Sequence, residues 1–197
     1  VLVVGDVVRL RENIEWFEKR PLFGRRIIVT RTREQAGEFA SLLREQGAEV
    51  IEFPTIRVVP PESWDEADRA IAELSSYGWI VFTSVNGVRA FMGRLRERGA
   101  DVRDLKGIRV CAIGPVTAEE VERLGIAPDL VPAEYRAEAL AEAMLREQVR
   151  GARVLLARAE RARDVLPALL KEQGAEVTVA AVYRTVAADE EAGSLRE

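Results

Sequence analysis

An internal repeat constrains the fold of this chain more than any other feature of its sequence. Residues 42–50 (LLREQGAEV) recur as residues 169–177 (LLKEQGAEV), and the segment RIIVTR at 26–31 aligns with RVLLAR at 153–158. Each copy is typical of an apolar strand, a helix closed by glycine and a second strand. Two copies of one strand–helix–strand unit indicate two similar lobes. The alternative is that a common helix ending arose twice by chance, which the length of the match disfavours.

Strands alternate with helices through most of the chain. This pattern is typical of parallel sheets covered by helices on both faces, so the predicted fold class is α/β. Long strands are expected at residues 49–59 and 176–186, and Ser63 with Glu66 forms a predicted capping box at a helix start. The other predicted strands cover residues 27–29, 79–82, 109–113, 129–131 and 154–156, and the predicted helices cover residues 33–46, 63–76, 86–98, 117–124, 137–148 and 164–173.

The composition excludes several classes of function. The chain has no histidine and one cysteine, Cys111, which removes the commonest general base and zinc ligand, so no metal site is expected. Cys111 lies among apolar residues and is expected in the core. A net charge of −4 with dispersed basic residues argues against nucleic-acid binding. No apolar run approaches the ~20 residues of a membrane helix, so a cytoplasmic enzyme or binding module is expected.

Polar residues follow two of the predicted strands at their carboxyl ends, where open α/β sheets bind ligands. Thr83, Ser84 and Asn86 begin a helix whose free amides could hold a carboxylate. Ser84 is equally expected as the N-cap of that helix. Gly114 would let a ligand approach the backbone, and Thr117 begins the next helix with a free hydroxyl. Both loops are also ordinary strand-to-helix turns.

Further candidates are a tyrosine and several arginines. Tyr183 lies between polar residues in the second long strand, near the expected junction of the lobes, where it could reach a ligand or simply pack. Arg31, Arg158 and Arg161 follow strand ends and are candidate partners for anions, although solvated surface positions are the common alternative. Chemistry in a chain without histidine must rely on such hydroxyls, arginines, carboxylates or backbone groups.

Three segments together carry a resemblance to a known family. The sequences VFTSVNGV at 81–88, AIGPVTA at 112–118 and VYRT at 182–185 occur in the order and spacing of uroporphyrinogen-III synthases. The resemblance extends from Arg25 to Glu197. The segment VVGDVVRL at 3–10 is similar to the extreme C-terminus of uroporphyrinogen-III C-methyltransferases, and bacterial fusions join these two enzymes in this order.

The resemblance implies two flavodoxin-like lobes with parallel sheets, joined by two long β-strands. Residues 1–20 would be the remnant of a methyltransferase domain with its linker. Residues 21–57 and 184–197 would form one lobe, and residues 58–183 the other. The C-terminal part of the first lobe would be missing, so the polypeptide is expected to continue beyond residue 197.

The resemblance also implies a reaction. Family members are hydro-lyases that close hydroxymethylbilane into uroporphyrinogen III, with loss of water, inversion of the last pyrrole ring and no cofactor. Tyr183 would assist departure of the hydroxyl, since phenols ordinarily titrate near pH ~10 and can donate at neutral pH. Thr117 would position the substrate. Alternatives are a two-lobed tetrapyrrole- or small-molecule-binding module without catalysis, and a single flavodoxin-like or receiver domain, which the repeat disfavours. The implied substrate-binding residues are Thr83, Ser84, Asn86, Gly114, Arg31 and Arg158.

Overall fold

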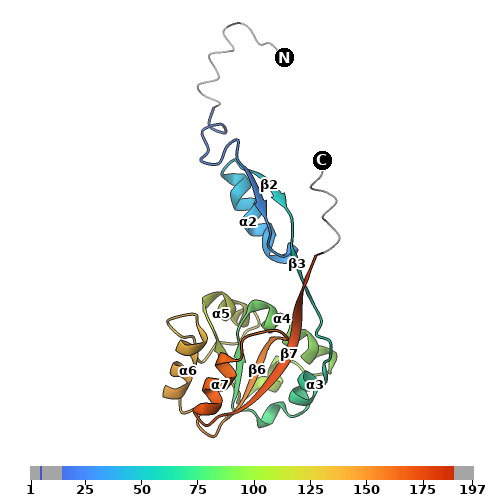
Figure 1. Ribbon diagram of the computed structural model, residues 1–197, viewed down its shortest axis with the longest axis vertical. Coiled ribbons are helices and arrows are strands. Elements are labelled where there is room, and N and C mark those ends of the chain that lie inside the picture. The colour runs from blue at the N-terminus through green and yellow to red at the C-terminus, as the bar shows by residue number, and fades with distance from the viewer. Residues whose placement is uncertain (1–4, 6–14, 189–197) are drawn as a thin grey trace. The chain divides into compact units, whose positions relative to one another are not determined.

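The computed structural model describes Gly5 and residues 15–188, and Figure 1 labels its helices and strands where there is room. The strand expected at residues 1–8 lies outside the described residues, apart from Gly5. The chain divides into two compact units, residues Val1–Arg57 with Val186–Glu197 and residues Val58–Thr185. Strands alternate with helices in the described chain, so the predicted α/β class is confirmed.

The first unit contains two strands and the helix between them. β1 (Arg26–Val29) and β2 (Glu49–Glu52) pair in parallel, and α2 (Arg33–Glu45) connects them. Parallel neighbours need such a crossover because the chain must return to the starting edge of the sheet. Ala40 of the helix and Val29 of the strand are buried, which gives this unit a small core.

The single long strand expected at residues 49–59 is two short strands. β2 ends at Glu52 and pairs with β1, whereas β3 (Ile56–Val59) is hydrogen-bonded to β7 (Glu176–Ala187). Pro54 lies in the break and has no N–H to donate, which disfavours a continuous strand there. The second expected long strand is present as β7, with 12 residues.

The second unit contains a five-stranded sheet in the order β3-β7-β6-β4-β5, of which Figure 1 labels β3, β7 and β6. β7, β6, β4 and β5 are mutually parallel neighbours. The strand expected at residues 129–131 is only an isolated bridge between Leu130 and Cys111. The elements not yet given are α3 (Asp65–Ala72), η2 (Leu74–Ser76), β4 (Trp79–Phe82), α4 (Val85–Glu97), η3 (Val102–Leu105), β5 (Arg109–Ala112), α5 (Pro115–Glu122), α6 (Ala137–Arg146), β6 (Arg153–Ala159) and α7 (Val165–Glu172).

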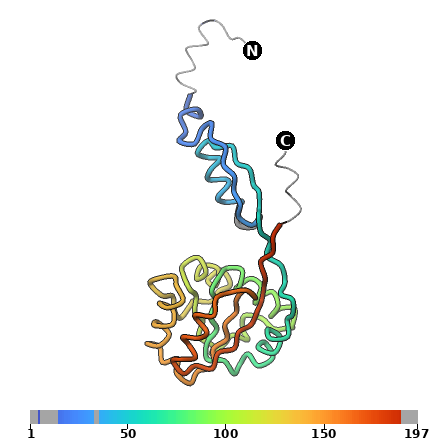
Figure 2. The backbone as a smooth tube through the Cα atoms, viewed as in Figure 1, coloured from blue at the N-terminus to red at the C-terminus, as the bar shows by residue number. Residues whose placement is uncertain are grey.

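Helices cover both faces of this sheet, and a separate apolar core lies on each face. Ile80 and Phe82 of β4 belong to the core that includes residues of α3 and α4. Trp79 and Val81 belong to the core that includes residues of α6 and α7. Successive side chains of a strand point to opposite faces, so a strand buried on both sides is apolar throughout. The backbone trace in Figure 2 shows the helices enclosing the strands.

The sequence repeat is a repeat of structure. β1-α2-β2 and β6-α7-β7 are both parallel strand–helix–strand units, and they share one register, with Arg26 opposite Glu49 and Arg153 opposite Glu176. Gly47 and Gly174 end the two helices with φ of 91° and 87°, a left-handed conformation that glycine adopts without steric cost. The predicted repeat is therefore confirmed as two copies of one unit.

The two copies differ in how deeply they are buried. Leu155 in β6 is fully buried, whereas Ile28, which aligns with it in β1, is 51% exposed. Leu166 in α7 is buried, and its counterpart Phe39 in α2 is exposed. Similar local sequences therefore form the same strand–helix–strand unit whether its apolar side chains are buried or exposed.

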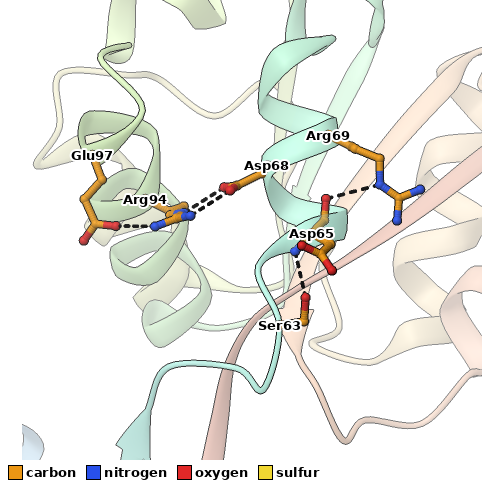
Figure 3. Close-up of polar contacts among 6 residues, drawn as sticks. All are labelled: Ser63, Asp65, Asp68, Arg69, Arg94 and Glu97. Atoms are coloured by element: carbon orange, nitrogen blue, oxygen red, sulfur yellow. Dashed lines mark hydrogen bonds and ion pairs between the residues drawn. The ribbon is translucent and has the colours of Figure 1, made fainter.

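The predicted capping box at the start of α3 is wrong, although its Ser63 contact to the Asp65 amide is present (Figure 3). The Ser63 hydroxyl accepts a hydrogen bond from the Asp65 amide at 3.0 Å, but the Glu66 carboxylate accepts from Arg69 at 2.5 Å instead of returning to Ser63. The helix begins at Asp65 with Trp64 as its N-cap residue. The Glu66 carboxylate, which the capping box required, instead forms an i,i+3 ion pair with Arg69.

Arg94 joins α3 to α4 on one face of the sheet (Figure 3). Its guanidinium donates to both carboxylate oxygens of Asp68 at 2.7 Å and to Glu97 at 2.8 Å, and it lies 4.9 Å from the ring centroid of Trp64. The hydrogen bond from Arg94 lowers the pKa of Asp68. This bidentate pair holds together two helices that pack on the same core.

Candidate functional site

The carboxyl ends of the parallel strands in the second unit lie at the same edge of its sheet. Successive strands are added first on one side of β4 and then on its other side. β4 is followed in sequence by its neighbour β5, whereas β6 and then β7 lie on the other side of β4. The switch point is therefore between β4 and β6. Open α/β sheets bind their ligands outside the carboxyl ends of the strands at such a point.

Ser84 lies at this switch point and makes two hydrogen bonds. Its hydroxyl accepts from the Gly87 amide at 3.0 Å, which confirms Ser84 as the N-cap of α4. The same oxygen lies 3.0 Å from the Tyr183 hydroxyl, and either group can be the donor. Thr83 and Asn86 are half-buried beside it. A pair of hydroxyls from residues 99 positions apart therefore occupies the strand ends.

The direction of the Tyr183 side chain depends on a register shift at the end of the β6–β7 pairing. The register shifts between Arg158 and Ala159, so that Ala159 lies opposite Tyr183. The Tyr183 carbonyl accepts from the Glu160 amide at 2.8 Å beyond the shift. Such irregularities change the direction of a side chain. The half-buried ring packs on the α3–α4 core, and its hydroxyl reaches Ser84 across the end of β6.

Gly87 is a site residue that the sequence did not single out. A Cβ atom there would lie 3.1 Å from the Ala157 carbonyl oxygen of β6 and 3.3 Å from the Ser84 hydroxyl. Any side chain here would have to displace the end of β6 or the Ser84 hydroxyl by a few tenths of an ångström, so glycine favours the close packing of the first turn of α4. The sequence did contain an indication, because glycine lies three residues after the N-cap serine, inside the first helical turn, where it is unfavourable unless packing requires it.

Gly114, the predicted point of ligand approach, has a side chain of its own chain close to its backbone. Its φ of −170° is ordinary extended backbone, so its conformation does not require glycine. A Cβ there would lie 3.0 Å from Cδ1 of Tyr135, so the group that approaches this backbone is the Tyr135 ring. Tyr135 itself is 65% exposed and was not singled out from the sequence. Thr117 lies in the first turn of α5, and its side chain is buried.

Of the three candidate arginines, Arg161 is exposed in the loop after β6, and the other two are in unlike surroundings. Arg31 belongs to the first unit, where it is exposed and its guanidinium lies 5.8 Å from the ring centroid of Phe39. Arg158 ends β6 in the second unit, and its side chain is only 9% exposed. Its guanidinium donates to the Arg163 carbonyl at 2.7 Å and to the Asp164 carboxylate at 2.5 Å. Arg158 is thus engaged with its own chain.

A buried carboxylate joins the two helices that begin at Ser84 and Thr117. Glu120 of α5 is 8% exposed and accepts from Arg89 of α4 at 2.7 and 3.0 Å, and from Arg123 at 3.0 Å. The hydrogen bonds from Arg89 are the main cause that lowers the pKa of Glu120. The starts of α4 and α5 are therefore held in fixed relation.

Replacing Glu120 with glutamine is expected to lower the free energy of unfolding by about 1–3 kcal/mol at pH 7, because hydrogen bonds to a charged group are lost. The folded-state pKa of Glu120 is lowered, so its contribution is present above its unfolded pKa of about 4.3 and disappears as the pH falls through the folded value. Urea unfolding at pH 7 and pH 3 measures this. The difference between wild type and Glu120→Gln should be smaller at pH 3 than at pH 7, while Glu119→Gln, at an exposed neighbour, should match wild type at both.

Nucleophilic catalysis by the single cysteine is not supported. Cys111 is fully buried in β5, and burial raises the pKa of its thiol to about 12. The thiolate is the nucleophilic form, so this group is inert at neutral pH. The expectation that Cys111 is a core residue is confirmed.

Among the described residues, no group of three or more carboxylate, thiol or imidazole side chains could hold a metal ion. The described helices include none long and apolar enough to cross a membrane.

The fold and the hydroxyl pair define a class of protein, a doubly wound α/β protein with a candidate ligand site at its switch point. The family model described as "Uroporphyrinogen-III synthase HemD" matches residues 37–197. The chain belongs to the uroporphyrinogen-III synthase family.

Relatives of known name agree with this assignment. The chain is 34% identical over 168 residues to "Uroporphyrinogen-III synthase" of Synechococcus elongatus, covering 85% of this chain and 63% of that protein. It is 32% identical over 185 residues to "Porphyrin biosynthesis protein HemD" of Ruminiclostridium josui, covering 94% and 37%. It is 29% identical over 125 residues to "Uroporphyrinogen-III C-methyltransferase" of Bacillus subtilis, covering 64% and 25%. The chain thus spans less than two thirds of the length of these relatives.

Solved structures support the fold alone. A mutant uroporphyrinogen III synthase from Thermus thermophilus superposes with a TM-score of 0.61 at 19% identity, over 83% of this chain and 63% of that one. The uroporphyrinogen-III synthetase of Helicobacter pylori gives a TM-score of 0.56 at 16% identity, over 86% and 65%.

Proposed function

We propose that the protein converts hydroxymethylbilane into uroporphyrinogen III, with loss of water and inversion of the last pyrrole ring. The observation that carries the proposal is the hydrogen-bonded pair of Ser84 and Tyr183 at the switch point. Loss of water from the substrate needs a proton donor near the departing hydroxyl. A phenol held by a second hydroxyl supplies one in a chain without histidine.

Tyr183 is the proposed catalytic donor, and Ser84 orients it. Ser84 is fixed by the Gly87 amide, so its oxygen offers the Tyr183 hydroxyl one defined partner. Proton transfer gains most when the donor is held in place before the reaction begins. Substrate carboxylates would be held by the free amides at the start of α4, with Thr83 and Asn86 beside them. Thr117 at the start of α5 is the proposed positioning residue.

The role of Arg158 and Arg31 in substrate binding is part of the same proposal. The family substrate carries many carboxylates, so cationic side chains near strand ends are suitable partners. Arg31 is exposed, which favours direct contact. Arg158 is buried and hydrogen-bonded to its own loop, which favours an indirect contribution.

We also propose the finer architecture implied by the family, two flavodoxin-like lobes made of residues 21–57 with 184–197 and of residues 58–183. The parallel order β5-β4-β6-β7 supports this for the second lobe, because flavodoxin-like sheets progress in the same way from their first strand. Similarity to a C-methyltransferase of Bacillus subtilis supports a fusion with such a domain, of which residues 1–20 would be the end.

The test is turnover of hydroxymethylbilane by the full chain, with the products oxidised to uroporphyrins and their isomers separated. Unassisted substrate closes without inversion and gives the type I isomer. The proposal requires the type III isomer in excess over type I. The competing hypothesis is a binding module without catalysis, and it requires type I product at the rate seen without protein, together with saturable binding of uroporphyrin.

A further inference from the structure

We propose that the loop after β6, residues 160–164, is an arm that binds substrate carboxylates through Arg161 and Arg163, and that buried Arg158 holds this arm in position. The inference rests on the proposed function for the identity of the substrate. Of the two candidate arginines that the sequence offered in this part of the chain, it keeps Arg161 as an anion contact, gives Arg158 a positioning role and adds Arg163.

The first support is the place of the arm. It follows the carboxyl end of β6, one of the two strands that bound the switch point, and leads into α7. The adjacent strand ends carry Ser84 after β4 and Tyr183 in β7. An anion held by this arm would therefore lie at the edge of the sheet where the hydroxyl pair lies.

The second support is the geometry of Arg158. Its guanidinium spans the arm, with one nitrogen bonded to the Arg163 carbonyl and another to the Asp164 carboxylate. These contacts draw the end of the arm onto the end of β6. Asp164 precedes α7, but its side chain makes no capping hydrogen bond to the helix. The structure therefore uses this carboxylate to fix the arm.

The third support is the distribution of charge. Residues 158–164 contain three arginines and two acids, but both acids are engaged. Asp164 accepts from Arg158, and the Glu160 carboxylate accepts from the Glu62 amide at 3.2 Å. Arg161 and Arg163 are exposed. The exposed face of the arm is therefore cationic, and carboxylates are its natural ligands.

The fourth support is an unsatisfied donor. Nε of Arg158 is buried and has no hydrogen-bond partner among the described residues. A buried donor without an acceptor costs free energy, so such groups are rare in native proteins. The end of β6 therefore holds a guanidinium that the described residues pair only in part, directly beneath the arm.

The direct test is fluorescence titration of the full chain with uroporphyrin III, which carries eight carboxylates. Arg161→Ala and Arg163→Ala should each raise the dissociation constant about 5-fold or more, and lysine at either position should restore part of the loss. Arg96→Ala removes the same charge from an exposed position at the far end of α4 and should change it less than about 2-fold. Equal effects of all three alanine variants would overturn the assignment, since they would report net charge alone.

The positioning role of Arg158 is tested through Asp164→Ala, which leaves all three arginines in place. The variant's net charge rises from −4 to −3, so unspecific electrostatics predicts tighter binding of the anionic uroporphyrin III. If the arm is held by the Arg158–Asp164 contact, binding should instead weaken at least about 3-fold. The thermal unfolding midpoint should also fall, because the buried Arg158 side chain loses its charged acceptor, so binding is measured well below the midpoints of both proteins. Tighter or unchanged binding would overturn the positioning role.

Failure of the proposed function gives a different result. Formation of the type III isomer by wild type tests that function. The titrations measure binding of uroporphyrin without turnover, so they test the arm separately from catalysis. A wild-type chain that forms no type III product, but whose uroporphyrin affinity depends on Arg161 and Arg163, would reject the catalytic proposal and keep the arm. An active chain whose KM and uroporphyrin affinity are unaffected by both substitutions would reject the arm alone.

Discussion

Tyr183→Phe is expected to slow formation of the type III isomer at least ~10-fold, a loss of about 1.4 kcal/mol of transition-state stabilisation. The substitution removes the hydroxyl that bonds to Ser84 and that is proposed to protonate the leaving group. The phenyl ring keeps its packing on the α3–α4 core, so the protein should still fold. The measurement is the type III to type I product ratio together with the single-turnover rate.

Tyr135→Phe is the matched control for this experiment. It removes the same group from an exposed ring that lies against Gly114 at a neighbouring strand end. Its turnover should equal that of wild type within about 2-fold. A wild-type rate in Tyr183→Phe would reject Tyr183 as the donor, and an equal loss in both variants would show that the assay responds to general disturbance of this edge.

Gly87→Val is expected to destabilise the protein by about 1–3 kcal/mol and to abolish most of its turnover. The new Cβ would lie 3.1 Å from the Ala157 carbonyl oxygen, and the added methyl groups need still more room. The start of α4 must therefore move away from β6. That movement carries Ser84 with it and breaks its hydrogen bond to Tyr183.

Gly93→Val supplies the comparison for Gly87→Val within the same helix. A Cβ at Gly93 meets nothing within 4 Å, and valine and glycine differ by only a few tenths of a kcal/mol in helix propensity. Thermal unfolding and turnover of Gly93→Val should therefore resemble wild type. Similar losses in both variants would mean that helix propensity, and not the close approach to β6, explains the effect at Gly87.

The sequence predicted those parts of the fold that depend on local chemistry. The wholly apolar run of β4 predicted a strand buried on both faces, and Gly47 and Gly174 predicted where two helices end. Ser84 was expected as an N-cap because a serine hydroxyl before a helix has an amide to accept from. Such features depend on few neighbouring residues, so they can be inferred without the rest of the chain.

Features that depend on distant partners could not be predicted. The contact between Ser84 and Tyr183 needs a register shift in the β6–β7 ladder, which no local pattern indicates. Arg158 was expected as an anion ligand, but its burial is decided by how the arm folds over it. The break in the strand expected at residues 49–59 had a local signal in Pro54, whose missing N–H deserved more weight than the apolar pattern around it.

The shared register of β1-α2-β2 and β6-α7-β7 bears on how such a protein can evolve. Strand pairing and the glycine that ends the helix are specified inside each copy, as the same left-handed turn at Gly47 and Gly174 indicates. Duplication of the gene segment that encodes one unit would therefore also duplicate the register in which its two strands pair. Selection could then alter single side chains of one copy, as at Ile28 compared with Leu155, without having to reinvent the module.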